Sequence, residues 1–421
     1  MTPQRNAQTV TTLVHKKTPL KILHDAELFH VKGYQAAGFH AGLKKRRRDI
    51  TIIHSQRPAT CAGVFTQNAV VAAPVTVSRE AVKRGNAQAI VVNSGCANAC
   101  TGEQGLKDAR AMQEIAAKLL KIQPEDVLVA STGVIGQLLP MDKVEAGIRQ
   151  AVSLLADNEP GAAAEGIMTT DTVPKQIVIE VPVGDKSFRL GGIAKGSGMI
   201  APNMATMLGF LVTDAGVDAT TLHKSLKESV DETFNNVSVD HDTSTNDMVV
   251  VLANGGSGLT VGKEIPLPVF KQALDYVNMH LAKTIARDGE GATKLILAHV
   301  NGALNKKDAR QAAKAIINSP LVKSAVHGAD PNWGRILCAV GYSGAKVELE
   351  SVVLKVGNAE KQIELLSKGE PLAFNREQAS ALLRGEEIHI FVDLGLGTQS
   401  ATAYGCDLSR EYVDINAHYT T

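Results

Sequence analysis

The stretch KGSGMIAPNMATMLGFLVTDAG, residues 195–216, changes character halfway along. Its first half is rich in glycine, which is typical of a loop, whereas residues 207–215 are apolar nearly throughout and predict a buried strand. An ordinary loop that leads into a core strand is one interpretation. The other is a peptide bond between Ala205 and Thr206 that is built to be broken, with Thr206 as a nucleophile.

The second interpretation rests on the chemistry of threonine. A Thr hydroxyl is a weak nucleophile until a base lies beside it, and the α-amine of an N-terminal Thr can be that base. A free α-amine has a pKa of about 7.7–8.0, which suits proton transfer near neutral pH. Self-cleavage needs a small residue before the Thr, a loop that can hold a strained peptide, and a rigid element after it. Ala205, the Gly-rich loop and the apolar strand meet these needs, but the pattern alone leaves both interpretations open.

Short apolar runs rich in β-branched residues recur along the chain and alternate with helical patterns. The predicted strands are DITIIH (49–54), AQAIVVNSG (87–95), EDVLVAST (125–132), KQIVIEVPV (175–183), MLGFLVTDA (207–215), DMVVVLANG (247–255), LILAHVNG (295–302) and IHIFVDLG (388–395). The predicted helices cover 105–121, 141–156, 219–236, 268–288 and 307–326. Several strands are apolar nearly throughout, so we expect their sheets to be covered on both faces. The elements predict an α/β or α+β protein with sheets layered between helices, in a strand order that the sequence leaves open.

Composition excludes several classes of function. The chain of 421 residues has 44 Lys and Arg against 43 Asp and Glu, a net charge of +1 that argues against nucleic acid or a membrane surface as partner. The N-terminal segment does not resemble a secretory signal, and no apolar run is long enough to span a membrane. Five scattered cysteines indicate reduced thiols, and neither they nor the 12 histidines show metal-ligand spacing. We therefore expect a cytoplasmic protein with no metal and no phosphate-binding loop.

Two further segments could form a catalytic site with Thr206. STGVIG (131–136) follows a predicted strand, and the Thr132 hydroxyl and Gly133 amide could face a developing oxyanion. A plain turn at the strand end is the alternative. In ARDGEGATK (286–294), Glu290 lies between two glycines, which suits either a cationic ligand or a turn in water.

Two polar loops have competing interpretations. MTTDTVPK (168–175) precedes a predicted strand, and helix capping is its default interpretation. SVDHDTSTND (238–247) gathers Asp240, Asp242 and Asp247 with His241, which could suggest a metal. It lacks the Gly and Glu positions of a calcium loop, so hydrogen bonding within a turn is the better interpretation.

KGSGMIAPNMATML closely resembles the self-cleavage motif of the ornithine acetyltransferase (glutamate N-acetyltransferase) family. Other segments also look like signatures of this family, in the family's order and over nearly the whole chain. They are VFTQNAVVAAPV (64–75), NSGCANACTGEQG (93–105), STGVIG (131–136), MTTDT (168–172), DTSTND (242–247), ARDGEGATK (286–294), SPLVKSAVHGADPNWGRI (319–336) and EYVDINAHYTT (411–421). One departure is His241, where the family pattern has Gly.

The resemblance implies an αββα sandwich that cleaves itself between Ala205 and Thr206. The α chain (1–205) and β chain (206–421) would form one intertwined catalytic body with a smaller subdomain in about 305–370, and would assemble as an α2β2 heterotetramer. Thr206 would be the nucleophile, and Thr132 and Gly133 match the oxyanion-hole pair. The positions that match the family's substrate-contacting residues are Thr169, Lys195, Thr206, Glu290, Asn416 and Thr421.

The reaction that the resemblance implies is acetyl transfer from N2-acetylornithine to L-glutamate in arginine biosynthesis. Thr206 would attack the acetyl carbonyl, ornithine would leave, and the acetyl ester would pass its acyl group to glutamate in a ping-pong mechanism. Lys195 is a candidate anchor for the α-carboxylate of both substrates, and Glu290 could pair with the ornithine ammonium. No dissociable cofactor is needed, and use of acetyl-CoA as a second donor stays open. The rival is an N-terminal-nucleophile amidohydrolase or aminopeptidase, which would pass the acyl group to water.

Overall fold

The computed structural model describes residues 19–201 and 207–418, and the fold below is that of these residues. Their strands form a nine-stranded sheet in the order β1-β6-β7-β8-β10-β3-β4-β5, with β2 paired to β3. These strands are β1 (Lys21–Ile22), β2 (Tyr34–Phe39), β3 (Ile50–Phe65), β4 (Asn86–Cys96), β5 (Val127–Val134), β6 (Lys175–Val183), β7 (Lys186–Lys195), β8 (Leu208–Thr213) and β10 (Met248–Ala253). The β8–β10 and β4–β5 pairs are parallel, and the others are antiparallel.

The long strand β3 divides this sheet into two halves that face each other. Its first residues pair with β2 and β4, whereas its last residues, from Thr60 to Phe65, pair with β10. Ile90 of β4 and Phe210 of β8 belong to one buried cluster between the halves. Because side chains alternate across a strand, Val249 and Val251 of β10 point to the face of the sheet opposite to the one that carries Ile90 and Phe210. The sheet is therefore folded over into two stacked β layers.

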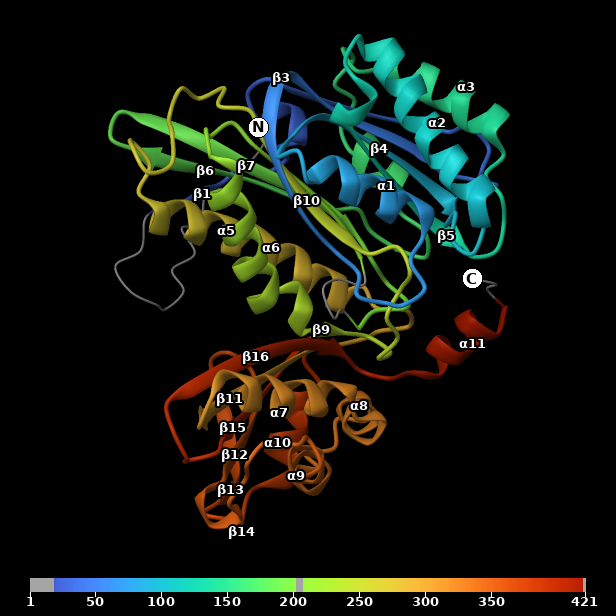
Figure 1. The fold of residues 1–421 in the computed structure, drawn as a ribbon. Helices are drawn as coiled ribbons and strands as arrows, with labels where there is room; N and C mark the ends of the chain where they lie inside the picture. Colours follow the sequence, from blue (N-terminus) through green and yellow to red (C-terminus); the bar gives the residue numbers. More distant parts are fainter. Residues whose placement is uncertain (1–18, 202–206, 419–421) are drawn as a thin grey trace, which may run out of the picture.

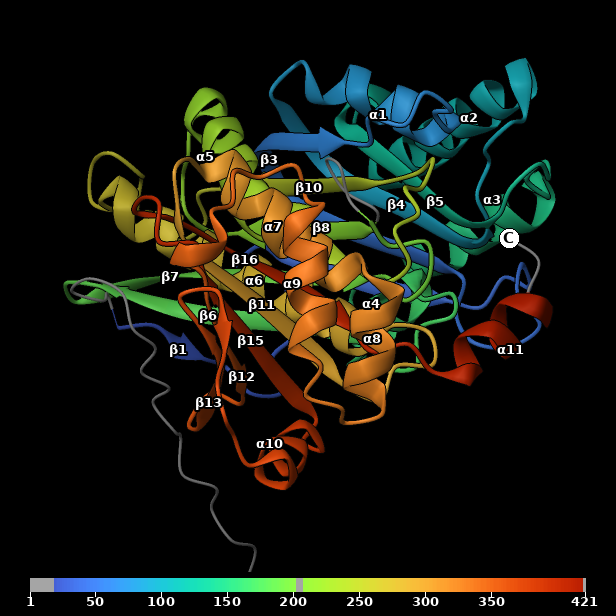
Figure 2. The same cartoon turned by 90° about the horizontal axis from the view of Figure 1, so that it is seen from below.

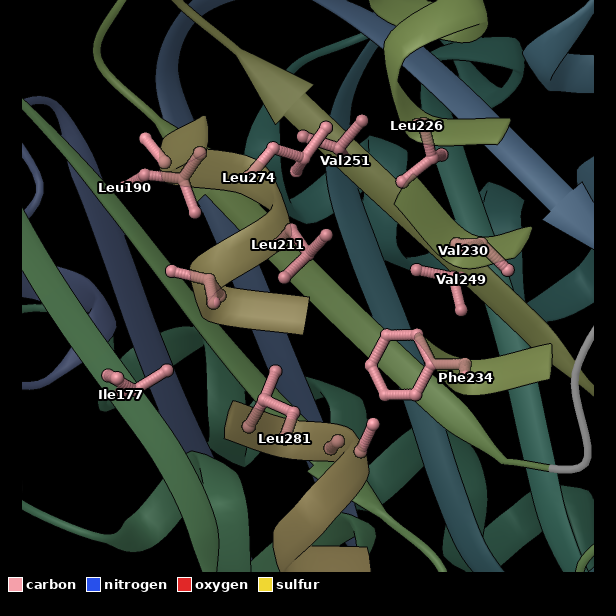
Figure 3. Packing of buried hydrophobic residues seen from close by; sticks show 14 of the residues in the cluster. Ile177, Leu190, Leu211, Leu226, Val230, Phe234, Val249, Val251, Leu274 and Leu281 are labelled. Carbon is pink, nitrogen blue, oxygen red and sulfur yellow. The ribbon is translucent and has the colours of Figure 1, made fainter. Parts of the chain in front are cut away.

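Helices cover both outer faces of these layers (Figure 1). The β3–β5 half is covered by α1 (Ala73–Val82), α2 (Gly102–Leu120) and α3 (Met141–Ser153). The other half is covered by α5 (Ala219–Glu232) and α6 (Leu267–Arg287), whose leucines interlock with those of β7 and β8 (Figure 3). The short helix α4 (Ala162–Ile167) packs at the edge between the layers. The predicted layered sandwich of sheets and helices is confirmed.

A second, seven-stranded sheet in the described part of the chain packs on the far side of α6. Its order is β14-β13-β12-β15-β11-β16-β9. The strands are β9 (Val237–Ser238), β11 (Leu295–Ala303), β12 (Val353–Gly357), β13 (Gln362–Ser367), β14 (Glu370–Pro371), β15 (Glu387–Asp393) and β16 (Gln399–Cys406). Its other face is covered by α7 (Lys306–Asn318), α8 (Pro320–His327), α9 (Trp333–Gly341) and α10 (Arg376–Leu383), which Figure 2 shows from below. The last helix, α11 (Arg410–His418), lies apart from this sheet.

Most predicted elements are confirmed, but two local interpretations are wrong. The single helix predicted over 307–326 is two helices, because Pro320 has no backbone N–H to continue α7 and Ser319 caps α8 by accepting a hydrogen bond from the Val322 amide. The segment 168–175 caps no helix N-terminus: Met168 ends α4, the rest connects α4 to β6, and Asp171 and Lys175 hold it in place. No helix in the described ranges is long and apolar enough to cross a membrane.

Candidate active site

One cavity of about 190 Å³ gathers the predicted site residues that the structure describes. Its walls come from the end of β5, the loop after α4, the end of β7, the start of β8, the loop before β10, the turn after α6, and α11. The predicted residues in this lining are Thr132, Gly133, Thr169, Lys195, Glu290 and Asn416. Ala205, Thr206 and Thr421 lie outside the described residues. Met207, the next residue after Thr206, also lines the cavity.

Thr132 and Gly133 belong to the last residues of β5 and line this cavity. Gly133 has φ +129°, and a Cβ there would lie 2.3 Å from the backbone carbon of Gly95. Only glycine allows this close approach of β4 and β5. Lys195 Nζ donates a hydrogen bond to Thr132 Oγ1 at 3.2 Å. Because an ammonium group can only donate, this contact leaves the Thr132 hydroxyl hydrogen for another acceptor.

Lys195 is a buried cation among several charged groups. Burial lowers its pKa, while the nearby carboxylates of Asp171, Asp247 and Glu290 act in the opposite direction. Asp171, whose charge acts on Lys195, is fully buried. A lysine in such a site presents its charge to the cavity with little solvent screening.

Asp171 joins the loop that carries Thr169 to the loop that begins after Lys195, and the sequence interpretation missed it. Its carboxylate accepts hydrogen bonds from the amides of Thr169 at 2.9 Å and Gly196 at 2.7 Å, and from Lys175 Nζ at 2.6 Å. Lys175 also contacts Asp288 Oδ2 at 2.5 Å. Burial raises the pKa of Asp171, but the charges of Lys175 and Lys195 outweigh it and hold this pKa at about 2. An ionised carboxylate is therefore the fixed link between the two loops.

Glu290 is buried and faces the cavity, so its interpretation as a turn residue in water is wrong. Asn416 of α11 donates a hydrogen bond from Nδ2 to Glu290 Oε2 at 2.8 Å. On the other side, a Cβ on Gly198 would lie 2.4 Å from the Glu290 carboxylate, so the glycine-rich loop packs directly on it. The buried carboxylate next to the cavity suits a cationic ligand group.

The loop 238–247 makes turn hydrogen bonds of the kind the sequence favours. Asp240 Oδ1 accepts from the Asp242 amide at 3.2 Å, which is a contact within the loop. The same carboxylate also accepts from the amides of Met199 and Ile200 in the glycine-rich loop, both at 2.7 Å. His241 has φ +69°, a conformation that favours glycine and accounts for the Gly of the family pattern at this position. In the described ranges, no group of three His, Cys, Asp or Glu side chains is placed to hold a metal ion.

Asn246, a second residue that sequence reasoning missed, connects this loop to the end of β5. Its buried Nδ2 donates to the carbonyl oxygens of Ala97 at 2.6 Å and Ser131 at 2.8 Å. The Ser131 carbonyl belongs to the same peptide unit as the Thr132 amide, so Asn246 fixes the orientation of this end of β5. The sequence signal for Asn246 was an amide side chain in DTSTND, directly before a predicted strand. Its hydrogen-bond partners are distant in the sequence, so this signal did not reveal them.

Comparison with known proteins identifies the family. The ArgJ family model matches residues 35–421. The chain belongs to the ArgJ family. It is 49% identical over 403 residues to "Arginine biosynthesis bifunctional protein ArgJ 1" of Clostridium acetobutylicum, which covers 95% of this chain and 99% of that protein. The ArgJ bifunctional protein of Listeria monocytogenes EGD-e is 50% identical over 396 residues, 93% of this chain and 97% of that protein.

Two solved ArgJ-type structures are also similar to this chain. The ArgJ protein of Bacillus halodurans is 47% identical with a TM-score of 0.48, over 50% of this chain and 98% of that chain. The ornithine acetyltransferase of Mycobacterium tuberculosis complexed with ornithine is 38% identical with a TM-score of 0.41, over 44% and 100%. From the family match and the close ArgJ relatives, the chain is an acyltransferase of arginine biosynthesis, as its sequence predicts.

Proposed function

We propose that this chain moves the acetyl group of N2-acetylornithine to the α-amine of glutamate through an acetyl ester on Thr206. The observation that carries the proposal is that Thr132, Lys195 and Glu290 line one cavity. Lys195 suits the α-carboxylate that both amino acids carry. Glu290 suits the side-chain ammonium of ornithine.

The chemistry proposed for this cavity begins with self-cleavage between Ala205 and Thr206, which frees the α-amine of Thr206. That amine takes the hydroxyl proton as the Thr206 oxygen attacks the acetyl carbonyl. The Thr132 hydroxyl and the Gly133 amide stabilise the negative charge that develops on the carbonyl oxygen, and one such donor contributes about 2.7–4 kcal/mol to the transition state. Ornithine leaves, and the α-amine of glutamate then attacks the ester, so that N-acetylglutamate is released and Thr206 is restored.

The proposal also covers how the two chains assemble and where in the cell the protein works. Residues 1–205 and 206–421 stay together as α and β chains in an α2β2 heterotetramer, with about 305–370 as a smaller subdomain, in the cytoplasm. Thr169, Asn416 and Thr421 contact the amino-acid substrates. No dissociable cofactor takes part, and acetyl-CoA is a candidate second donor for the same Thr206.

Intact mass of the purified full-length protein tests the cleavage. We expect two fragments, with a new N-terminal sequence of TMLGF on the second, and a single uncut chain for Thr206→Ala. The control is Thr220→Ala, which removes an exposed threonine of α5 and should be cut like the wild type. An uncut wild type with full transferase activity would contradict the N-terminal threonine mechanism.

A kinetic assay tests the acceptor. With N2-acetylornithine and glutamate, the transferase forms N-acetylglutamate and ornithine in equal amounts, whereas the rival hydrolase releases free acetate without acetylglutamate. Glu290→Gln should raise KM for acetylornithine because the substrate ammonium loses its carboxylate partner. Repeating the assay with acetyl-CoA in place of acetylornithine decides whether both donors are used.

A further inference from the structure

A second cavity, of about 700 Å³, opens between α7, the residues that follow α9 and the loop 238–247. We call it the α7 groove; its lining includes His241, Tyr342 and the cations Lys307, Arg310 and Lys314. No acidic side chain of the described residues lines it. A volume of this size is typical of small-molecule sites, and the transfer reaction above gives this groove no role.

The three cations of the groove form a stripe along one face of α7. Lys307, Arg310 and Lys314 follow each other at spacings of three and four residues, which places them on the same side of the helix. The opposite side carries residues such as Ala313 and Ile316 and is buried in the core. Because an α-helix rises by about 1.5 Å per residue, the stripe spreads its charges over about 10 Å. That length exceeds a single phosphate and suits a diphosphate.

The positive charge of the stripe is only partly neutralised. Arg310 Nη2 donates to Glu232 Oε1 at 2.6 Å, and Lys306 Nζ lies 2.8 Å from the other oxygen of the same carboxylate. One negative charge is thus shared between two cations, and Arg310 Nε has no hydrogen-bond partner in the described ranges. Burial and the charge of Arg310 lower the pKa of Lys314. An anion bound in the groove would offset this repulsion between like charges.

Tyr342 and His241 line the groove from two other elements. Tyr342, directly after α9, is 62% exposed, and an exposed aromatic ring beside a row of cations can stack on a nucleobase. His241 is held at φ +69° where the family pattern has Gly, so its ring is a feature of this chain. Its neighbours Asp240 and Asp242 line the catalytic cavity. The groove and the cavity are therefore separated by one loop.

We propose that the α7 groove binds a nucleoside diphosphate group, whose phosphates lie along the stripe from Lys307 to Lys314 and whose base stacks on Tyr342. Free nucleotides carry this group, and so does an acyl donor that is linked to a nucleotide, such as acetyl-CoA. A free nucleotide would be a regulator, whereas a nucleotide-linked donor would be a substrate of the neighbouring cavity. The inference concerns binding and goes beyond the proposed transfer from acetylornithine.

Isothermal titration calorimetry of the full-length protein, with ADP and with coenzyme A as probes, tests the groove. Lys307→Glu reverses an exposed charge in the first turn of α7, where a carboxylate suits the helix dipole. We expect it to raise the dissociation constant of each bound probe by roughly tenfold, the scale of one lost hydrogen bond to a charged group. Lys361→Glu makes the same change of charge in the exposed turn between β12 and β13 and should bind like the wild type. Tyr342→Ala should weaken ADP binding and leave pyrophosphate binding unchanged.

The same probes separate the two sources of the nucleotide. Coenzyme A bound more tightly than ADP, with a KM for acetyl-CoA that rises in Lys307→Glu while the KM for acetylornithine does not, identifies a nucleotide-linked donor. ADP bound as tightly as coenzyme A, with no change in either KM, identifies a free nucleotide. Both results support the groove as the binding site.

Three results would overturn the inference. The first is a folded wild type that binds neither ADP nor coenzyme A. The second is binding that Lys307→Glu does not weaken, and the third is equal weakening by Lys307→Glu and Lys361→Glu. Melting temperatures check folding, and His241→Gly replaces Lys307→Glu if that variant does not fold. Calorimetry does not depend on acetyl transfer, so a protein that transfers no acetyl group from acetylornithine contradicts the proposed function and not the groove.

Discussion

Lys195 Nζ donates a hydrogen bond to the Oγ1 atom of Thr132 at 3.2 Å, inside the cavity that both residues line. The two residues come from the ends of β7 and β5, which are not neighbours in the sheet. The contact orients the Thr132 hydroxyl so that its hydrogen is available to an acceptor in the cavity. In the proposed reaction it would also place a buried positive charge next to the oxyanion that develops.

Replacing Lys195 by Met should therefore reduce kcat as well as substrate affinity. We expect kcat to fall by roughly 10²-fold, the lower end of the loss seen when an oxyanion donor is removed, because the Thr132 hydroxyl is no longer oriented or polarised. Steady-state kinetics with acetylornithine and glutamate measure it. Lys186→Met, at the exposed start of the same strand, should leave both kcat and KM unchanged. A rise in KM with full kcat would show that Lys195 acts only as a carboxylate anchor.

Asn246→Ala should slow catalysis beyond its effect on stability. The variant leaves the Ala97 and Ser131 carbonyls without their donor, and such a loss destabilises a protein by about 1–3 kcal/mol. Because the end of β5 that carries Thr132 is then less well oriented, we also expect a lower kcat. The control is Asn278→Ala, which removes a buried hydrogen bond to Ser229 away from the cavity. If both variants lose stability and neither loses kcat, Asn246 has a structural role only.

Gly133→Ala should abolish most activity, whereas Gly136→Ala, in the turn directly after β5, should not. Both glycines have positive φ, so both substitutions strain the backbone. A Cβ at Gly133 would also lie 2.3 Å from the Gly95 backbone, whereas a Cβ at Gly136 meets nothing within 4 Å. The comparison separates the effect of displacing the end of β5 that carries Thr132 from the effect of backbone strain. Transferase assays at equal concentrations of folded protein measure it, and equal losses in the two variants would contradict the prediction.

The ion pair of Asp171 with Lys175 should stabilise the protein above about pH 4 and lose this effect in more acidic solution. The pKa of Asp171 is about 2 in the folded protein, below the ordinary value of 3.8, so the folded state holds the carboxylate ionised where the unfolded state protonates it. Stability from this group is present above the unfolded pKa and declines as pH falls from about 4 to about 2. Melting temperatures of the wild type and Asp171→Asn should differ at pH 6 and converge toward pH 2. A difference that stays constant over this range would exclude the linkage.

Local sequence patterns were sufficient for most of the secondary structure. The run from Lys175 to Val183 is predicted and found as β6 with the same bounds, because alternation and β-branched residues are properties of neighbouring positions. The helix over 307–326 failed at Ser319 and Pro320, where a cap and a missing amide outweigh helical periodicity. Strands such as β7, with adjacent glycines and charged residues, carry no clear pattern and depend on pairing with β6 and β8.

By itself, the sequence determined the layered α/β class, the resemblance to a family and the candidate residues of the site. Only the tertiary structure decided that Glu290 is buried against Asn416, that Asn246 fixes the carbonyl of Ser131, and that Asp247 Oδ2 has no hydrogen-bond partner within residues 19–201 and 207–418. The first of these pairs is separated by 126 positions in the chain and the second by 115. Such contacts require polar atoms to come within about 3 Å of each other. That distance depends on strand order and on the folding over of the first sheet, which the periodicity of neighbouring residues does not encode.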